Sequence, residues 1–168
     1  MTNVICVAAG QGSTKKTDHI VNRRHHYLNY GLLSLASVLK RVGLEPVVVH
    51  GHFAPAQEVV VRAMSLGMSD TTFPVLISLP SFYAVGWTRD FIRLAKAVRP
   101  DLRFVLGGRW VVDGRPDLLR ELIPEADDIV SGLAERQIAD IVLRGRTSLK
   151  NFYRSGPEED RPVSSLDY

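Results

Sequence analysis

Residues 73–106, FPVLISLPSFYAVGWTRDFIRLAKAVRPDLRFVL, decide the fold. Two short apolar runs, 73–79 and 103–106, enclose a stretch of helical length at 85–98. Apolar side chains recur in that stretch at steps of three and four residues, and Pro100 follows it, so the pattern predicts an amphipathic helix that ends there. A strand, a helix and a second strand of this kind form a unit of a parallel sheet.

The same alternation repeats outward along the chain. The predicted strands are 3–8, 45–50, 73–79, 103–106 and 128–130. The predicted helices are 31–42, 55–68, 85–98, 115–123 and 135–143. Continuous apolar runs are typical of strands that are covered on both faces. The sequence therefore predicts an α/β fold, a flavodoxin-like (Rossmann-like) doubly wound five-stranded parallel sheet with helices on both faces.

Length and composition indicate one domain. The chain has 168 residues and is 45% hydrophobic, which is enough for a core on both faces of a sheet. After Gly145 the chain becomes polar, and residues 155–162 have the composition of a linker. We therefore expect a domain at 1–146 and a polar tail at 147–168.

Composition also excludes several functional classes. Lys and Arg outnumber Asp and Glu by only 21 to 18, too small an excess for a nucleic-acid-binding surface. Cys6 is the single cysteine, so a disulfide framework and a Cys-x-x-Cys motif are both excluded. No apolar run approaches the roughly 18 residues that span a bilayer. We expect a soluble, cytoplasmic protein without nucleic-acid or membrane partners.

Ligands of doubly wound sheets bind beyond the carboxyl ends of the strands, which directs attention to the loops there. Three of these loops combine small, hydroxyl-bearing and aromatic residues. The candidates after the third predicted strand are Ser78, Leu79, Pro80, Ser81 and Phe82. Those after the fourth and fifth are Gly107, Gly108, Arg109, Gly132, Leu133 and Glu135. Trp110, which follows Arg109, fits either an interface or the core.

The loop after the first strand, 10–30, is long for such a connection, which often indicates function. Its basic and histidine side chains could bind a phosphate, a carboxamide-rich cofactor or a metal ion. The alternative is that they belong to a solvated loop without a ligand. These residues are Lys15, Lys16, His19, Arg23, Arg24, His25 and His26. Gly10-Gln11-Gly12 is not a dinucleotide fingerprint, because position 15 is Lys, and a Gly-x-x-x-x-Gly-Lys phosphate loop is absent from the sequence.

Several motifs occur in an order that is similar to a known family. Residues 31–39 read Gly-Leu-Leu-Ser-Leu-Ala-Ser-Val-Leu. Ile77-Ser78 lie near the end of the third predicted strand, and Val-Leu-Gly-Gly at 105–108 spans the end of the fourth. Ser78 and Gly107 lie 29 positions apart, from 107 − 78. Over residues 27–146 the chain resembles the amino-terminal cobalamin-binding domain of cobalamin-dependent radical S-adenosylmethionine enzymes.

The resemblance implies a cofactor and the residues that hold it. The corrin ring of cobalamin would lie over the strand ends, against Tyr30, Gly31 and Leu32. Its dimethylbenzimidazole tail would run between the third and fourth strands, beside the segment from Ser78 to Phe82. Gly107 and Gly108 would leave room for the tail.

Two departures from related proteins bear on this expectation. The Asp-x-His-x-x-Gly motif, which supplies a lower axial histidine in other cobalamin carriers, is absent. The resemblance therefore implies cobalamin held base-off without a protein histidine ligand. The family's Gly-Glu-Gly-Glu after the fifth strand reads Gly132-Leu133-Ala134-Glu135 here, which implies an altered contact to the ring.

One cysteine cannot ligate an iron–sulfur cluster. We therefore expect no catalysis by this chain alone. S-adenosylmethionine and a [4Fe–4S] cluster would belong to a radical S-adenosylmethionine barrel, in cis or in trans, with methyl transfer as the expected reaction. Two other functions remain open. One is a flavodoxin-like protein that holds a flavin or nucleotide phosphate through Ser13, Thr14 and Thr17, and the other is a degenerate domain that binds protein.

Overall fold

The computed structural model describes residues 3–11, 29–111, 116–144 and 152–154, in which strands and helices alternate. The first half contains β1 (Asn3–Ala8), α2 (Tyr30–Arg41), β2 (Glu45–His50), α3 (Ala56–Ala63), a π-helical segment (Met64–Met68) and β3 (Val75–Ser78). The second half contains α4 (Ala84–Val98), β4 (Phe104–Gly107), α5 (Pro116–Leu122), β5 (Asp128–Ser131), α6 (Ile138–Arg144) and β6 (Phe152–Arg154).

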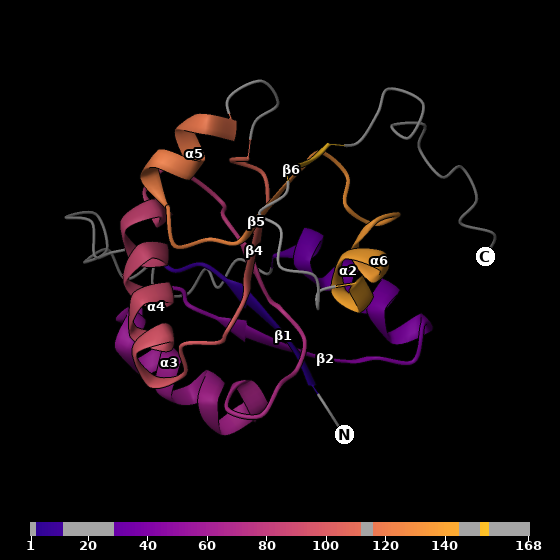
Figure 1. Ribbon diagram of the computed structural model, residues 1–168, viewed down its shortest axis with the longest axis horizontal. Coiled ribbons are helices and arrows are strands. Elements are labelled where there is room, and N and C mark those ends of the chain that lie inside the picture. Colours follow the sequence, from indigo (N-terminus) through magenta and orange to yellow (C-terminus); the bar gives the residue numbers. More distant parts are fainter. Residues whose placement is uncertain (1–2, 12–28, 112–115, 145–151, 155–168) are drawn as a thin grey trace, which may run out of the picture.

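The strands form one parallel sheet in the order β2-β1-β3-β4-β5-β6. Helices α3, α4 and α5 cover one face, and α2 and α6 cover the other (Figure 1). The chain reverses its winding direction between β1 and β3, which is the switch point of a doubly wound sheet. The predicted α/β fold is confirmed, and each of the five predicted strands is present.

Several boundaries differ from the sequence prediction, and two of these differences have clear local causes. Strand β3 begins at Val75 rather than at residue 73, because the Phe73 N–H donates to the Thr71 hydroxyl and Pro74 has no N–H to give to a ladder. The helix predicted at 55–68 loses its α-helical form after Ala63, and Gly67 leaves helical geometry with a φ of 111°.

A sixth strand lies in the segment that the sequence predicts to be a polar tail. Residues Phe152–Arg154 pair in parallel with β5, in the register Ile129 to Phe152 and Ser131 to Arg154. The sheet therefore extends beyond residue 146 at this edge.

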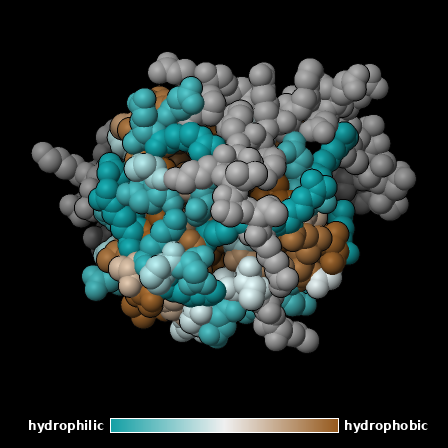
Figure 2. Space-filling view, in the orientation of Figure 1, coloured by the Kyte–Doolittle hydropathy of each residue, from teal (hydrophilic) through white to brown (hydrophobic). Residues whose placement is uncertain are grey.

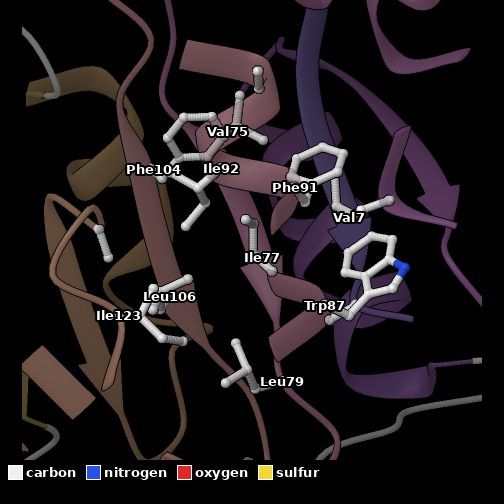
Figure 3. Packing of buried hydrophobic residues seen from close by; sticks show 14 of the residues in the cluster. Val7, Val75, Ile77, Leu79, Trp87, Phe91, Ile92, Phe104, Leu106 and Ile123 are labelled. Carbon is white, nitrogen blue, oxygen red and sulfur yellow. The ribbon is translucent and has the colours of Figure 1, made fainter. Parts of the chain in front are cut away.

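The face covered by α3, α4 and α5 has a closely packed aromatic core (Figure 3). The Trp87 and Phe91 rings stack with centroids 5.3 Å apart, and Phe91 meets Phe104 edge to face at 6.3 Å. The indole N–H of Trp87 is not left unpaired, since it donates to the Ala54 carbonyl over 2.8 Å. This half of the core is filled by the protein's own side chains.

The face covered by α2 and α6 has a smaller, mainly aliphatic core, to which Cys6 belongs. Burial raises the pKa of the Cys6 thiol to about 12, so this cysteine stays protonated and unreactive at neutral pH. On the surface shown in Figure 2, hydrophilic residues predominate among the described residues and hydrophobic ones form separate patches. Within the described part of the chain, none of the helices has the length and apolar character needed to cross a bilayer.

Candidate functional site

A cavity of about 800 Å³ opens at the carboxyl ends of the strands and extends between the sheet and helices α2 and α6. Most of its lining is apolar, with a few polar groups. Strands and following loops contribute Ala8, Ala9, Gln11, His50, His52, Phe53, Leu76, Ile77, Ser78, Pro80, Val105, Leu106, Gly107, Gly108, Arg109, Val111, Val130, Gly132, Leu133, Ala134 and Glu135. Helices α2 and α6 and the residue before α2 contribute Asn29, Tyr30, Gly31, Leu32, Leu35 and Ile138.

The cavity exists because small residues form a row across the sheet. Ala8 of β1 is in register with Ser78 of β3, and Ser78 is in register with Gly107 of β4. The positions two residues earlier, Cys6, Leu76 and Val105, all belong to the core on the α2/α6 face. Because side chains alternate along a strand, the row of small residues faces the same side. These residues leave the space above the strand ends unfilled.

Aliphatic side chains complete the walls. Leu32 and Leu35 come from α2, and Ile138 comes from α6. A hydrogen bond links α2 to the segment before α6, because the Ser34 hydroxyl donates to Glu135 over 3.3 Å. A slot with an apolar floor and apolar walls suits the flat, apolar body of a ligand.

Polar groups are concentrated where α2 begins. Asn29 caps this helix, since its side-chain oxygen accepts the Leu32 N–H over 3.0 Å. Its amide nitrogen donates to the Ser78 hydroxyl over 2.8 Å. The cap therefore ties the first turn of α2 to the end of β3, inside the cavity.

Two histidines lie at the β2 end of the cavity. His50 of β2 lies in register with Ala8, at the end of the row of small residues. Its ring stacks on that of His52 with centroids 5.0 Å apart. The His50 carbonyl accepts a hydrogen bond from Arg62. Desolvation and the nearby Arg62 charge lower the pKa of His50 below its usual range. The imidazole is therefore neutral at physiological pH.

Gly107 and Gly108 have different roles. A Cβ on Gly107 meets only the Val130 carbonyl, at 3.5 Å, so the absence of a side chain there contributes to the open space. Gly108 has a φ of 107°, and a Cβ on it lies 2.6 Å from the Leu79 nitrogen and 2.8 Å from the Ser78 hydroxyl. A side chain on Gly108 would therefore collide with Leu79 and Ser78, so the turn itself requires a glycine there, and the expectation that Gly108 leaves room for a ligand stays a prediction.

Most of the residues proposed from sequence lie around this cavity. They are Tyr30, Gly31, Leu32, Ser78, Pro80, Gly107, Gly108, Arg109, Gly132, Leu133 and Glu135. The side chain of Leu79 lies instead in the core on the α3/α4/α5 face, in the same cluster as Leu106 (Figure 3). Ser81 accepts a hydrogen bond from Gln11, and neither Ser81 nor Phe82 lines the cavity.

Phe82 belongs to an exposed aromatic group near the cavity. Its side chain is 57% exposed, and its ring lies 6.4 Å from that of Tyr83 and 5.6 Å from that of Trp110. Trp110 is partly buried against the core, so the structure supports the core role, and the interface role stays a prediction.

Sequence reasoning missed Asn29, His50 and His52. His50 is the last residue of the second strand and His52 lies in the short loop that follows it, and neither is among the site residues predicted from the sequence. The rule that ligands bind beyond strand ends applies to this strand as well and provides the missing signal. Asn29 is a helix-capping residue type two positions before the predicted helix at 31–42, and directly before the observed start of α2 at Tyr30. The basic and histidine residues at positions 15–26 lie outside the described residues.

Metal ligands do not cluster in the described part of the chain. Within residues 3–11, 29–111 and 116–144, no group of three or more His, Cys, Asp or Glu side chains is arranged to hold a metal ion. Independently of this, the mainly apolar lining of the cavity suits an organic ligand with an apolar body and a few polar anchors.

Comparisons with known proteins support the fold. No protein-family model and no curated protein matches the chain. Among solved structures, the chain is similar to a novel cobalamin-binding protein from Desulfitobacterium hafniense DCB-2, with a TM-score of 0.56 and 17% identity. The match covers 82% of this chain and 55% of that chain, so the likeness spans little more than half of the neighbour's length. At this identity the match shows a shared fold.

Proposed function

We propose that the chain is a cobalamin-binding module. The observation that carries the proposal is the row Ala8, Ser78 and Gly107, which opens an apolar slot at the switch point of the sheet. Protein interiors are normally close-packed, so larger side chains would fill this space if it served stability alone. The similar structure from D. hafniense is described as cobalamin-binding, which adds support.

The residues present fit this cofactor. The slot between Leu32, Leu76 and Ile138 would take the flat dimethylbenzimidazole tail, with the Ser78 hydroxyl as a polar anchor. The corrin ring would lie at the mouth, against Tyr30 and Gly31. Tyr30 is 77% exposed, so it offers a large surface to a ring outside the slot. A Cβ-free position at Gly107 gives the tail close access to the sheet.

When bound, cobalamin would supply a cobalt centre that can accept and donate a methyl group. The tail cannot occupy the slot and coordinate cobalt together, so we propose that cobalamin is held base-off. We further propose that cobalt has no protein histidine ligand. The slot, the Asn29 cap and the two helices then bind and orient the cofactor and exclude water from its tail.

The wider system belongs to the same proposal. The motif resemblance supports a role beside a radical S-adenosylmethionine barrel, in cis or in trans, with methyl transfer as the reaction. Arg109, Gly132, Leu133 and Glu135 lie around the cavity and would contact the ring's periphery. A partner would supply the [4Fe–4S] cluster, because the chain has one cysteine and that cysteine is buried.

The flavin or nucleotide alternative has less support. Ser13, Thr14 and Thr17, which would hold the phosphate, lie outside the described residues. Gly10 has a packing role, since a Cβ there would lie 2.6 Å from the Trp87 indole nitrogen. No described feature favours a phosphate at this glycine.

An absorption spectrum tests the proposal. The purified chain is incubated with hydroxocobalamin, with flavin mononucleotide or with neither, and free ligand is removed by gel filtration. The proposal predicts retained cobalamin with a base-off spectrum and no retained flavin. Loss of all cobalamin on the column contradicts cobalamin binding, and a retained base-on spectrum contradicts the proposed placement of the tail.

A further inference from the structure

The hydrogen bonds of Asn29 have a fixed direction. A backbone N–H can only donate, so the atom of Asn29 that faces Leu32 must be the side-chain oxygen. The NH₂ group then faces Ser78, whose hydroxyl oxygen accepts from it over 2.8 Å. The orientation of this amide follows from the helix cap and needs no other argument.

This direction determines what the Ser78 hydroxyl can do. A hydroxyl has one proton to donate and lone pairs to accept with, and Asn29 occupies the accepting side. Within the described part of the chain, the Ser78 hydroxyl donates no hydrogen bond. Ser78 is 9% exposed and lines the cavity. Its proton is therefore available to an acceptor atom inside the slot.

We infer that Asn29 is a positioning residue that makes Ser78 a hydrogen-bond donor to the ligand's tail. The inference rests on the proposed function and goes beyond it, because it assigns a selective step to a residue outside the motifs. The slot would select a flat, apolar group that carries an acceptor atom, such as an unprotonated aromatic ring nitrogen. A tail without an acceptor would leave the buried hydroxyl proton unpaired, which disfavours its binding.

The substitution Asn29→Asp tests this role with little change in shape. Asp is as good a helix cap as Asn, and its negative charge suits the start of a helix, so α2 should keep its stability. An ionised carboxylate only accepts hydrogen bonds, so the Ser78 proton would turn toward it. Ser78 would then have no proton to offer the ligand.

Two corrinoids separate the tail from the ring. Hydroxocobalamin carries the dimethylbenzimidazole tail, and diaquocobinamide lacks it. We expect Asn29→Asp to raise the Kd of hydroxocobalamin about tenfold or more, the usual effect of losing one hydrogen bond in a binding site. The Kd of diaquocobinamide should stay within about twofold, and the melting temperature should not fall.

A double-mutant cycle with Ser78→Ala shows whether the effect passes through the hydroxyl. In the Ser78→Ala background, Asn29→Asp should cause no further loss of hydroxocobalamin binding. A full, additive loss there would mean that the new charge acts directly on the ligand, and it would overturn the inference. Unchanged hydroxocobalamin binding by Asn29→Asp, or equal weakening of both corrinoids, would also overturn it. Failure of the unsubstituted chain to bind either corrinoid would instead overturn the proposed function, and the inference with it.

Discussion

The two faces of the sheet are packed in different ways. On the α3/α4/α5 face, large rings such as Trp87, Phe91 and Phe104 pack against one another in a closed core. On the α2/α6 face, the residues at the strand ends are Ala8, Ser78 and Gly107, and a cavity remains. The first face is closely packed by the protein's own side chains, whereas the second leaves an apolar cavity.

This difference indicates that one face is packed for stability, whereas the other is shaped to bind a ligand. Unfilled apolar space loses packing contacts, so a fold gains nothing from it by itself. A bound tail would restore the contacts that the small residues give up. The α3/α4/α5 face should therefore be stable without ligand, and the stability of the α2/α6 face should increase when a ligand is bound.

The largest loss of stability is expected from a substitution in the closely packed core on the α3/α4/α5 face. Phe91 is fully buried between two aromatic partners, so Phe91→Ala should lower the free energy of unfolding by about 3–5 kcal/mol. Denaturant titration measures this loss. Phe82→Ala is the matched control, because Phe82 is 57% exposed and its loss should cost much less. Similar costs for the two variants would contradict the contrast between core and surface.

The next effect concerns the ligand and should be confined to one face. At a free cobalamin concentration of about 100 times Kd, binding should stabilise the fold by about 2.7 kcal/mol. Hydrogen exchange should show greater added protection in α2 and α6 than in α4. Added protection concentrated in α4 would indicate a ligand on the α3/α4/α5 face and would contradict the proposed site.

A third test separates the two adjacent glycines. Gly108→Ala should cost about 1–3 kcal/mol in folding free energy, because it forces a side chain into a left-handed conformation and against Leu79. Gly107→Ala should leave stability nearly unchanged, since its Cβ has ordinary contacts. Melting curves of both variants check this prediction. A harmless Gly108→Ala would instead favour the idea that this glycine serves the ligand.

The smallest effect is a pH dependence at the β2 end of the cavity. Desolvation and Arg62 lower the pKa of His50 in the folded state, so the contribution of neutral His50 is lost as the pH falls below about 6.5 toward that lowered value. His50→Gln should reduce the loss of stability between about pH 8 and pH 5. The difference should stay below about 1 kcal/mol, because solvent screens this partly exposed group. Identical pH profiles of the two proteins would contradict the assignment.

The sequence predicts the fold well where both faces of a strand are buried. The five predicted strands are continuous apolar runs because helices cover both sides of the sheet. Strand β6 gives no such signal, since Phe152–Arg154 is only 3 residues long and lies in a polar segment. Short edge strands depend on tertiary contacts more than on their own pattern.

The candidate site is only partly predictable for a similar reason. The position of ligands beyond strand ends follows from topology, and this rule leads to Ser78 and Gly107. The register between strands places His50 beside Ala8, and sequence alone does not supply that register. Sequence also gives Gly107 and Gly108 the same appearance, although only the first leaves open space.

Cobalamin binding by the unsubstituted chain and by Gly107→Leu tests the central claim most directly. A leucine at this position would project into the slot between Ser78 and Val130, where a Cβ already fits without strain. Calorimetric titration with hydroxocobalamin, beside melting curves of both proteins, should show binding by the unsubstituted chain only. The account predicts a Kd at least about tenfold higher for Gly107→Leu at an unchanged melting temperature. Equal binding by the two proteins would contradict the claim that cobalamin occupies the cavity on the α2/α6 face.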